Sequence, residues 1–285
     1  MGSTRCRIAL FVYDQYKSEY ENVFGPMPAL RDTAGAPIIP EASEADTPRC
    51  DPLDATVKAL VTPVYVNFGK AIAAYERKII SRNSRFDQFY EEITTGILVS
   101  DKLTEQEISG LKLFVGKGNC VSCHKGSNFS DWKFHSTGIS QAGANLPAED
   151  RGRADGVPAV VRDEFNCLSE WSDQPDKTQC EVTELASRNS GAASEPNELG
   201  AFKTPTLRSV SLSAPYFHTG TLKTLEEVIG LYDRGGDPSG FLGSVDENIR
   251  QLSLSDDEKL ALVAFLRALE GQPLDGSLLT DPRGP

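Results

Sequence analysis

Residues 120–124 read Cys120-Val121-Ser122-Cys123-His124, which is the C-x-x-C-H pattern of covalent attachment of a c-type haem. In this pattern the two thiols bond to the two vinyl groups of one porphyrin. The histidine that follows the second thiol binds the iron from one face. We therefore expect one covalent haem c, attached through Cys120 and Cys123, with His124 as the proximal iron ligand.

Two other uses of a C-x-x-C motif fit the sequence less well. A zinc site would need a second close cysteine pair or a nearby pair of histidines. The other cysteines are isolated: Cys6, Cys50, Cys167 and Cys180. A thioredoxin-like redox motif would need a βαβ context, whereas the flanks here read as helical and then irregular. Haem attachment is the favoured interpretation, to be tested against the structural context.

Length and composition are those of a soluble globular protein. The 285 residues suffice for one or two domains, with 39% hydrophobic and 25% charged residues. The net charge of −12 argues against nucleic acid and against an anionic membrane surface as partners. An acidic surface can steer a basic redox partner, but the same charge also serves solubility, which is the preferred explanation.

Haem attachment of this kind takes place outside the cytoplasm, so a secretory signal is expected. The only apolar run near the start, Ile8 to Val12, is too short for a signal sequence or a membrane span. Either a leader was removed or the chain is part of a longer protein, and we expect a periplasmic or otherwise extracytoplasmic location. In an oxidising compartment Cys167 and Cys180 are the favoured disulfide, and Cys6 with Cys50 is a second candidate.

The N-terminal part of the sequence predicts two helices. Apolar spacing indicates a helix over residues 7–24, ended by Gly25-Pro26, and a long helix over about 53–81, kinked or restarted near Pro63. Between them, residues 28–53 contain five prolines and are typical of an extended connector.

Three capping boxes predict the helices of the C-terminal part. Thr104, Thr224 and Ser255 are each followed three residues later by glutamate. They begin helices that end near Gly116, at Gly235-Gly236 and at Leu269. Residues 125–200 are polar and scarcely periodic, so we expect them to wrap a cofactor or to be partly disordered. A helix, a haem motif, a long wrap and a closing helix match an all-α, class I cytochrome c-like domain with long irregular haem-wrapping loops.

Four segments resemble the C-terminal half of the bacterial di-haem cytochrome c peroxidase and MauG superfamily, in the same order. The resemblance covers about residues 55–270. The segments are 110–124 (GLKLFVGKGNCVSCH), 129–138 (FSDWKFHSTG), 202–220 (FKTPTLRSVSLSAPYFHTG) and 225–236 (LEEVIGLYDRGG). In that family an N-terminal haem reacts with peroxide, a C-terminal haem supplies its electrons, and a calcium ion lies between them. The resemblance implies that this chain carries the electron-transfer half.

The sequence departs from the family in having one haem motif. The part before residue 55 is too short for a haem domain and contains no histidine. Either the first haem domain is lost or truncated, or it belongs to another chain. We therefore expect an N-terminal helical segment at 1–103, left from an incomplete first domain, then a cytochrome c domain at 104–276 and a tail at 277–285.

The resemblance also bears on the second axial ligand. Methionine is nearly excluded, because Met1 and Met27 are the only methionines and lie far upstream of the motif. The family's ligand position falls on Tyr232, and MauG-type members resemble this chain in carrying tyrosine there. A tyrosinate oxygen favours Fe(III). The alternative is that Tyr232 is a core aromatic residue of an amphipathic helix.

The other candidate site residues follow from the same motifs. The resemblance places His218 near the haem edge and the calcium, where positioning is favoured over ligation. His135 is expected to be a satisfied loop or core histidine. Arg208 can pair with a haem propionate or be an ordinary surface arginine. The backbone carbonyls of Ser213 and Pro215 match a family calcium turn, but the side-chain ligand that the family takes from its N-terminal domain is not in this sequence.

These features predict a c-type cytochrome that transfers electrons through one haem and supports peroxide reduction or a related oxidation. The alternatives are an electron-carrier module without peroxidase turnover, a true peroxidase with an open iron face, and a truncated inactive homologue. The expected partners are a small cytochrome or cupredoxin and hydrogen peroxide, with a homodimer left open. Trp132 and Trp171 could serve electron transfer, but packing is their default role.

Overall fold

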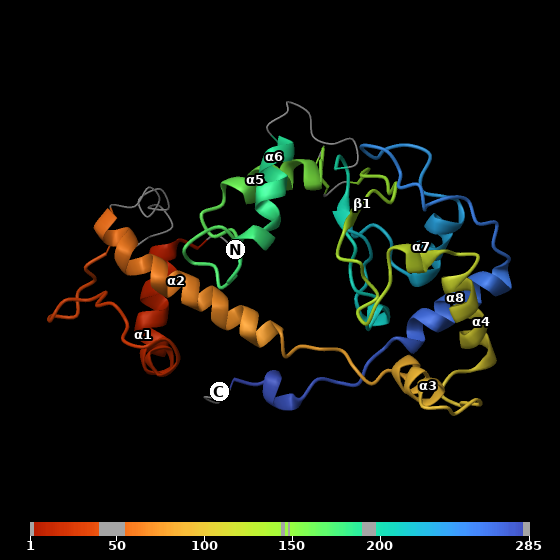
Figure 1. The fold of residues 1–285 in the computed structure, drawn as a ribbon, viewed down its shortest axis with the longest axis horizontal. Helices are drawn as coiled ribbons and strands as arrows, with labels where there is room; N and C mark the ends of the chain where they lie inside the picture. Colours follow the sequence, from red (N-terminus) through yellow and green to blue (C-terminus); the bar gives the residue numbers. More distant parts are fainter. Residues whose placement is uncertain (1–2, 40–54, 144–145, 148, 190–197, 282–285) are drawn as a thin grey trace. The chain divides into compact units, whose positions relative to one another are not determined.

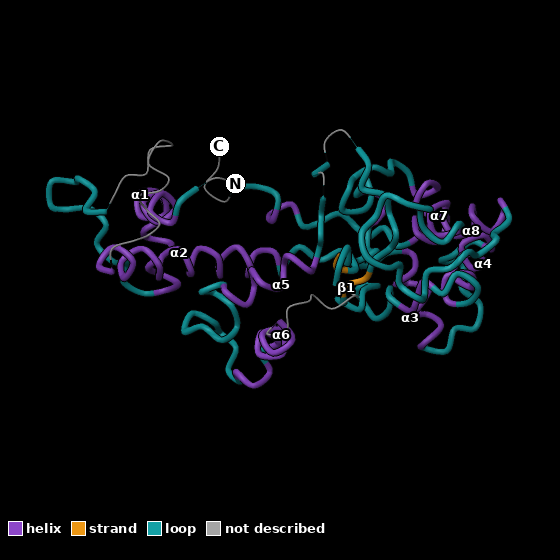
Figure 2. Tube along the Cα trace, turned by 90° about the horizontal axis from the view of Figure 1, so that it is seen from above, coloured by secondary structure: helices purple, strands orange, loops and turns teal. Residues whose placement is uncertain are grey.

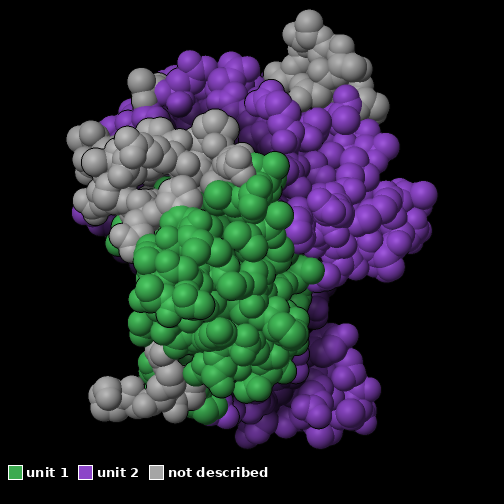
Figure 3. All heavy atoms as spheres, turned by 90° about the vertical axis from the view of Figure 1, so that its left-hand side faces the viewer, with its two compact units in different colours: residues 1–80, 276–285 green, residues 81–275 purple. Residues whose placement is uncertain are grey.

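The computed structural model describes residues 3–39, 55–143, 146–147, 149–189 and 198–281. These residues are mostly helical, with one very short antiparallel ribbon (Figure 1). The chain divides into two compact units (Figure 3). Unit 1 comprises residues 1–80 with 276–285, and unit 2 comprises residues 81–275.

Unit 1 contains the two long helices that the apolar spacing predicts. Helix α1 spans Arg5–Phe24, is kinked at Tyr16, and ends at Gly25, whose φ of 84° suits glycine. Helix α2 spans Ala55–Glu76 and runs through Pro63 without interruption. It ends at Glu76, before the predicted end at about residue 81. Buried side chains of both helices form the core of this unit, including Cys6, Leu10, Val61 and Val64.

Unit 2 is built on helices whose ends are fixed by local sequence. Helices α4 (Glu105–Val115), α7 (Leu225–Asp233) and α8 (Asp256–Ala268) each begin with the predicted capping box. After α7 the chain turns at Gly235, where φ is 80° and a β-carbon would lie 2.9 Å from the amide nitrogen of Gln251. Helix α3 (Arg85–Thr94) was not predicted. It begins with a capping box of Ser84 and Asp87.

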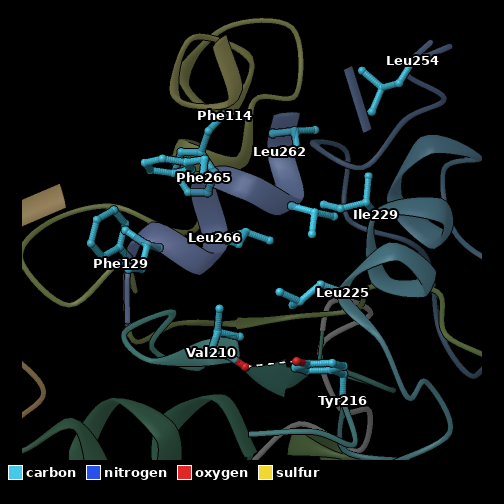
Figure 4. Close-up of a cluster of buried hydrophobic side chains, with 12 residues drawn as sticks. Phe114, Phe129, Val210, Tyr216, Leu225, Ile229, Leu254, Leu262, Phe265 and Leu266 are labelled. Atoms are coloured by element: carbon cyan, nitrogen blue, oxygen red, sulfur yellow. Dashed lines mark hydrogen bonds between the residues drawn. The ribbon is translucent and has the colours of Figure 1, made fainter. Parts of the chain in front are cut away.

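The core of unit 2 forms where α4 packs against α8. Gly110 of α4 lies directly against the backbone of Ala261 in α8, so there is no room for a side chain between the helices. The rings of Phe114 and Phe265 meet beside this crossing, with centroids 5.2 Å apart. Further apolar side chains of α7, α8 and the loops complete the cluster shown in Figure 4, among them Phe129, Val210, Leu225, Ile229 and Leu266.

The long segment between the haem motif and α7 contains more structure than the sequence predicts. It is mainly loop (Figure 2), but it includes α5 (Arg153–Arg162) and α6 (Glu181–Asn189). The two helices pack against each other, and a disulfide joins Cys167 to Cys180 as predicted, with α-carbons 5.6 Å apart. Strands β1 (Phe134–His135) and β2 (Phe202–Lys203) pair across this insertion. The wrap is therefore partly ordered by contacts made within it.

Two further expectations concern covalent and membrane structure. The second disulfide candidate includes Cys50, which lies outside the described residues. Among the helices of the described ranges, none combines the length and apolar character required to cross a bilayer. The all-α class with long irregular loops is confirmed.

Candidate functional site

The C-x-x-C-H motif lies in a tight turn just after α4. Asn119 adopts a left-handed conformation with φ of 50°, and a short 3-10 turn, η2 (Cys120–Ser122), follows it. The amide of His124 donates to the carbonyl of Cys120 at 2.8 Å, which folds the motif back on itself. Cys120 and Cys123 are free thiols, and burial raises the pKa of Cys120 to about 12. The turn therefore presents two protonated thiols and one imidazole within a single short segment.

His124 is held in the form that can bind a metal. Its Nδ1 lies 2.9 Å from the backbone carbonyl oxygen of Phe129. Because a carbonyl only accepts hydrogen bonds, Nδ1 carries the proton and the lone pair is left on Nε2. Burial lowers the pKa of His124 and so favours the neutral ring. A hydrogen bond of this kind fixes the ring orientation and the tautomer of a ligating histidine.

Tyr232 lies in the last turn of α7 and its phenol is close to the motif. Burial raises the pKa of Tyr232, and the neighbouring thiols of Cys120 and Cys123 raise it further. On another side its ring faces that of Phe217, with centroids 6.0 Å apart. The structure therefore brings Tyr232 close to Cys120 and Cys123, from which it is distant in the sequence.

Strained backbone conformations gather around these residues. Seven non-glycine residues in the described ranges have positive φ, and four of them adjoin the motif, His124 or Tyr232: Asn119, Phe129, Trp132 and Phe217. Each such conformation costs on the order of 1 kcal/mol and persists only where surrounding contacts enforce it. Such conformations gather at functional sites, so this region is a candidate for one.

A charged network lies next to the second thiol. His135 bonds through Nδ1 to Asp246 at 2.6 Å and through Nε2 to Asp131 at 3.0 Å. Burial opposes protonation of His135, but hydrogen bonds to the two carboxylates outweigh it and raise the pKa of the imidazole. The expectation of a satisfied histidine is thus met, with the ring charged between two carboxylates.

Cys123, Asp131 and His135 also lie close enough to be considered as a metal cluster. Both nitrogens of His135 face carboxylate oxygens, which accept hydrogen bonds, so both nitrogens act as donors. A doubly protonated ring has no lone pair for a metal ion. The cluster is better described as an ion-pair network that orders the loop beside Cys123.

Arg208 and His218 contact other groups at the rim of the site. The guanidinium of Arg208 pairs with Asp87 of α3 through two nitrogens, at 2.9 and 3.0 Å. Its Nε donates to the carbonyl of Ser127 at 2.6 Å. His218 stacks on Phe202, with ring centroids 3.4 Å apart and planes inclined by 12°. A propionate contact of Arg208 and a positioning role of His218 stay predictions.

The turn proposed to bind calcium is ordered by Tyr216. Its hydroxyl donates to the carbonyl of Val210 at 3.1 Å, as drawn in Figure 4, and its amide donates to Leu222 at 2.7 Å. Ser213 and Pro215 are exposed on this turn. Calcium binding by their carbonyls stays a prediction.

Sequence reasoning missed the acidic partners of this region. Asp131 stands four residues before His135, a spacing that could have suggested a pair. Asp246 and Asp87 offer no such signal, because their partners His135 and Arg208 are distant in the sequence. These carboxylates support the loops that carry the motif.

The donor set fits a c-type haem. Cys120 and Cys123 would hold the haem by two thioether bonds, and His124, a neutral imidazole with a fixed tautomer, would bind its iron. The phenol of Tyr232, near both thiols, would be available as a second ligand. The residues that would hold the group therefore already lie together in the fold.

Comparisons with known proteins point in the same direction. The chain is 32% identical over 204 residues to the cytochrome-c peroxidase IdrP2 of Denitromonas iodatirespirans, a match covering 72% of this chain and 48% of the relative. It is 29% identical over 203 residues to the methylamine utilization protein MauG of Methylorubrum extorquens, covering 71% of this chain and 44% of that protein. The chain thus spans about half the length of the curated relatives it matches. No protein-family model matches it.

Solved structures give weaker matches. The di-haem peroxidase BthA of Burkholderia thailandensis aligns with a TM-score of 0.49 at 19% identity, over 94% of this chain and 59% of that chain. A MauG-like protein associated with microbial copper homeostasis aligns with a TM-score of 0.48 at 25% identity, over 81% and 61% of the two chains.

Proposed function

Because the chain belongs to the superfamily of bacterial di-haem cytochrome c peroxidases and MauG, we propose that it transfers electrons through one covalently attached haem c and thereby supports peroxide reduction or a related oxidation. The proposed attachment residues are Cys120 and Cys123. The proposed axial ligands are His124 and Tyr232.

The observation that carries the proposal is the arrangement around His124. Its Nδ1–H is fixed by the carbonyl of Phe129, and the phenol of Tyr232 lies by the two thiols of the same motif. A packing role for Tyr232 alone would not require a buried hydroxyl beside two thiols.

In this proposal the side chains and backbone around the motif position the groups that would bind the haem. When bound, the haem supplies a one-electron Fe(III)/Fe(II) couple. The carbonyl of Phe129 orients the imidazole, and the phenol of Tyr232, which would release its proton to solvent on binding iron, would supply a hard anionic oxygen that favours the oxidised state. The ring of Phe217 packs beside the phenol, with ring centroids 6.0 Å apart.

Ligation by Tyr232 also favours a second candidate function, an electron-carrier module without peroxidase turnover. With both axial positions filled, peroxide has no open position at the iron. Turnover would then require another haem, in the part of the relatives that this chain does not match. We place the haem domain at residues 104–276.

Location, calcium and partners form part of the proposal. The Cys167–Cys180 disulfide suits an oxidising compartment, which supports an extracytoplasmic location. Calcium would bind at the carbonyls of Ser213 and Pro215. A small cytochrome or a cupredoxin is the proposed electron partner.

The test uses the full chain matured in a bacterial periplasm. A pyridine haemochrome assay with intact mass measurement should find one haem per chain, and Cys120→Ala combined with Cys123→Ala should abolish attachment. The proposal would be refuted if Cys167→Ala lost the haem while the Cys120→Ala, Cys123→Ala double variant kept it, or if the unmodified chain carried no haem. Fast peroxide reduction by the unmodified holoprotein would exclude the carrier alternative and Tyr232 as a permanent ligand.

A further inference from the structure

We propose that an exposed basic aromatic patch, comprising Lys125, Trp132, Lys133, Phe134 and Lys203, is the docking surface for an acidic one-electron carrier protein, with Trp132 as its central contact. This inference rests on the proposed electron-transfer function. It adds where on the surface the partner docks, what charge the partner carries, and that Trp132 is the central contact.

Trp132, Phe134 and Lys203 gather at the β1–β2 ribbon, and Lys125 and Lys133 are exposed on the loop that leads into β1. Phe134 pairs with Lys203 and His135 pairs with Phe202, and successive residues of a strand point to opposite faces. Phe134 and Lys203 therefore share one face, which is open to solvent, whereas His135 contacts Asp131 and Asp246 on the other. The ammonium of Lys203 lies 4.9 Å from the ring centroid of Trp132. The guanidinium of Arg153 lies 4.0 Å from that of Phe134.

Trp132 is held outward by defined contacts although its conformation is unfavourable. Its side chain is 50% exposed and its φ is 59°, a region that bulky residues avoid. Its amide donates to Oγ of Ser130 at 3.0 Å, and that buried hydroxyl donates to the carbonyl of Thr204 at 2.7 Å. These hydrogen bonds hold the loop in a strained conformation in which the large ring of Trp132 faces solvent. Exposed, rigid tryptophan is typical of the energetic centre of protein interfaces.

The charge of the patch is opposite to that of the whole protein. The chain carries −12, yet segments 125–134 and 202–208 contain the exposed Lys125, Lys133 and Lys203, while Arg208 is already paired with Asp87. Their one acidic residue, Asp131, has a side chain only 4% exposed and paired with His135. Glu198, the partner of Arg153, is also largely buried. A local positive surface on an acidic molecule selects the orientation of an acidic partner at encounter.

The patch is also joined to the haem-attachment residues by a short path. The amide of Asp131 donates to the carbonyl of Cys123 at 2.8 Å, and Trp132 is the next residue. Ten covalent bonds and one hydrogen bond therefore separate the sulfur of Cys123 from the indole ring of Trp132. A carrier seated on Trp132 would lie at the end of that path.

The experiment measures electron transfer from the dithionite-reduced holoprotein to the ferric haem domain of cytochrome b5, an acidic carrier. One electron passes from the ferrous haem of this protein to the ferric acceptor, and stopped-flow absorbance follows both. We expect the second-order rate constant to fall as ionic strength rises. At low ionic strength the rate constant should be lower with mitochondrial cytochrome c, which is basic, than with cytochrome b5.

Matched variants separate the patch from general effects. Lys203→Glu should lower the rate with cytochrome b5 by about tenfold at low ionic strength. Lys112→Glu, at an exposed position of α4, makes the same charge change, and its rate should stay within about twofold of that of the unmodified protein. Trp132→Leu should lower the rate by about tenfold and weaken binding measured by calorimetry with both proteins ferric. Trp132→Phe should recover most of the binding, and Trp171→Leu should match the unmodified protein.

The outcomes distinguish this inference from the proposed function. If haem is attached and reducible but Lys203→Glu and Lys112→Glu behave alike, or Trp132→Leu has no effect, the patch is not the docking surface. If sedimentation shows a dimer that Trp132→Leu dissociates, the occupant is a second copy of the chain and the inference is wrong. If no haem is attached, the proposed function itself has failed, and the patch inference fails with it.

Discussion

Replacing Gly110 with alanine should destabilise unit 2, because Gly110 is where α4 and α8 touch. A β-carbon there would lie 2.6 Å from the carbonyl carbon of Ala261 and 2.8 Å from the β-carbon of Phe265, and closer still to the carbonyl oxygen of Ala261. These are atoms of a packed helix, so the helices must separate. Overpacking of this kind costs about 1–3 kcal/mol or more, against a gain of about 1 kcal/mol from replacing glycine within a helix.

We expect a net loss of about 2 kcal/mol in the free energy of unfolding, because the two helices also carry the Phe114–Phe265 contact. The assay is urea unfolding of the full-length holoprotein, followed by far-ultraviolet circular dichroism. The control is Gly156→Ala in α5, where a β-carbon meets nothing within 4 Å. That change should stabilise by about 0.5–1 kcal/mol. If both variants gained stability equally, the close crossing would be refuted.

Three further predictions concern the site and its support. Tyr232→Phe should convert six-coordinate ferric iron to a high-spin form and raise the rate of peroxide consumption; an unchanged absorption spectrum would exclude Tyr232 as a ligand. Cys167→Ala with Cys180→Ala should lower the free energy of unfolding by about 3 kcal/mol, the value for a loop of this size, whereas a midpoint equal to that of the unmodified oxidised protein would contradict a structural disulfide. The raised pKa of His135 means that protonation stabilises the fold: the contribution is complete below the unfolded pKa near 6.5 and is lost as pH rises through the higher folded value. His135→Gln should therefore cost more at pH 5.5 than at pH 9, by roughly 1–3 kcal/mol, and equal costs in urea unfolding at the two pH values would count against the ion-pair network.

Elements with strong local signals were predictable from the sequence. Thr104, Thr224 and Ser255 each place a hydroxyl three residues before a glutamate, and the three helices begin where these boxes predict. Helix α3 carries the same device with Asp87 in place of glutamate, so its signal was present but weaker. Local capping was sufficient because it depends on neighbouring residues alone.

Elements that depend on distant contacts were not predictable. Helix α5 contains Gly156 and Pro158 and has no side-chain cap, and it is stabilised by packing on α6. Strands β1 and β2 have two residues each, too few for an alternating pattern. Their pairing is fixed by register across the insertion, which no local pattern encodes.

The candidate site, too, has residues that the sequence predicts and residues that only the structure reveals. The motif gave Cys120, Cys123 and His124 from spacing, and the family resemblance gave Tyr232. The support of this site came only from the structure: the carbonyl of Phe129 beside His124, and Asp246 opposite His135. Such partners are chosen by the fold and carry no sequence pattern of their own.

The α4–α8 crossing also has a kinetic consequence. Gly110 and Ala261 are far apart in the sequence, so their contact closes about three quarters of unit 2 into one loop. Contacts between residues so distant in sequence must overcome a large loss of chain entropy before they gain packing energy, which slows folding. The α5–α6 pair, by contrast, makes contacts between near neighbours and is cross-linked within itself. We therefore expect this pair to acquire structure first during refolding, and the closing of unit 2 by α8 to limit the overall rate.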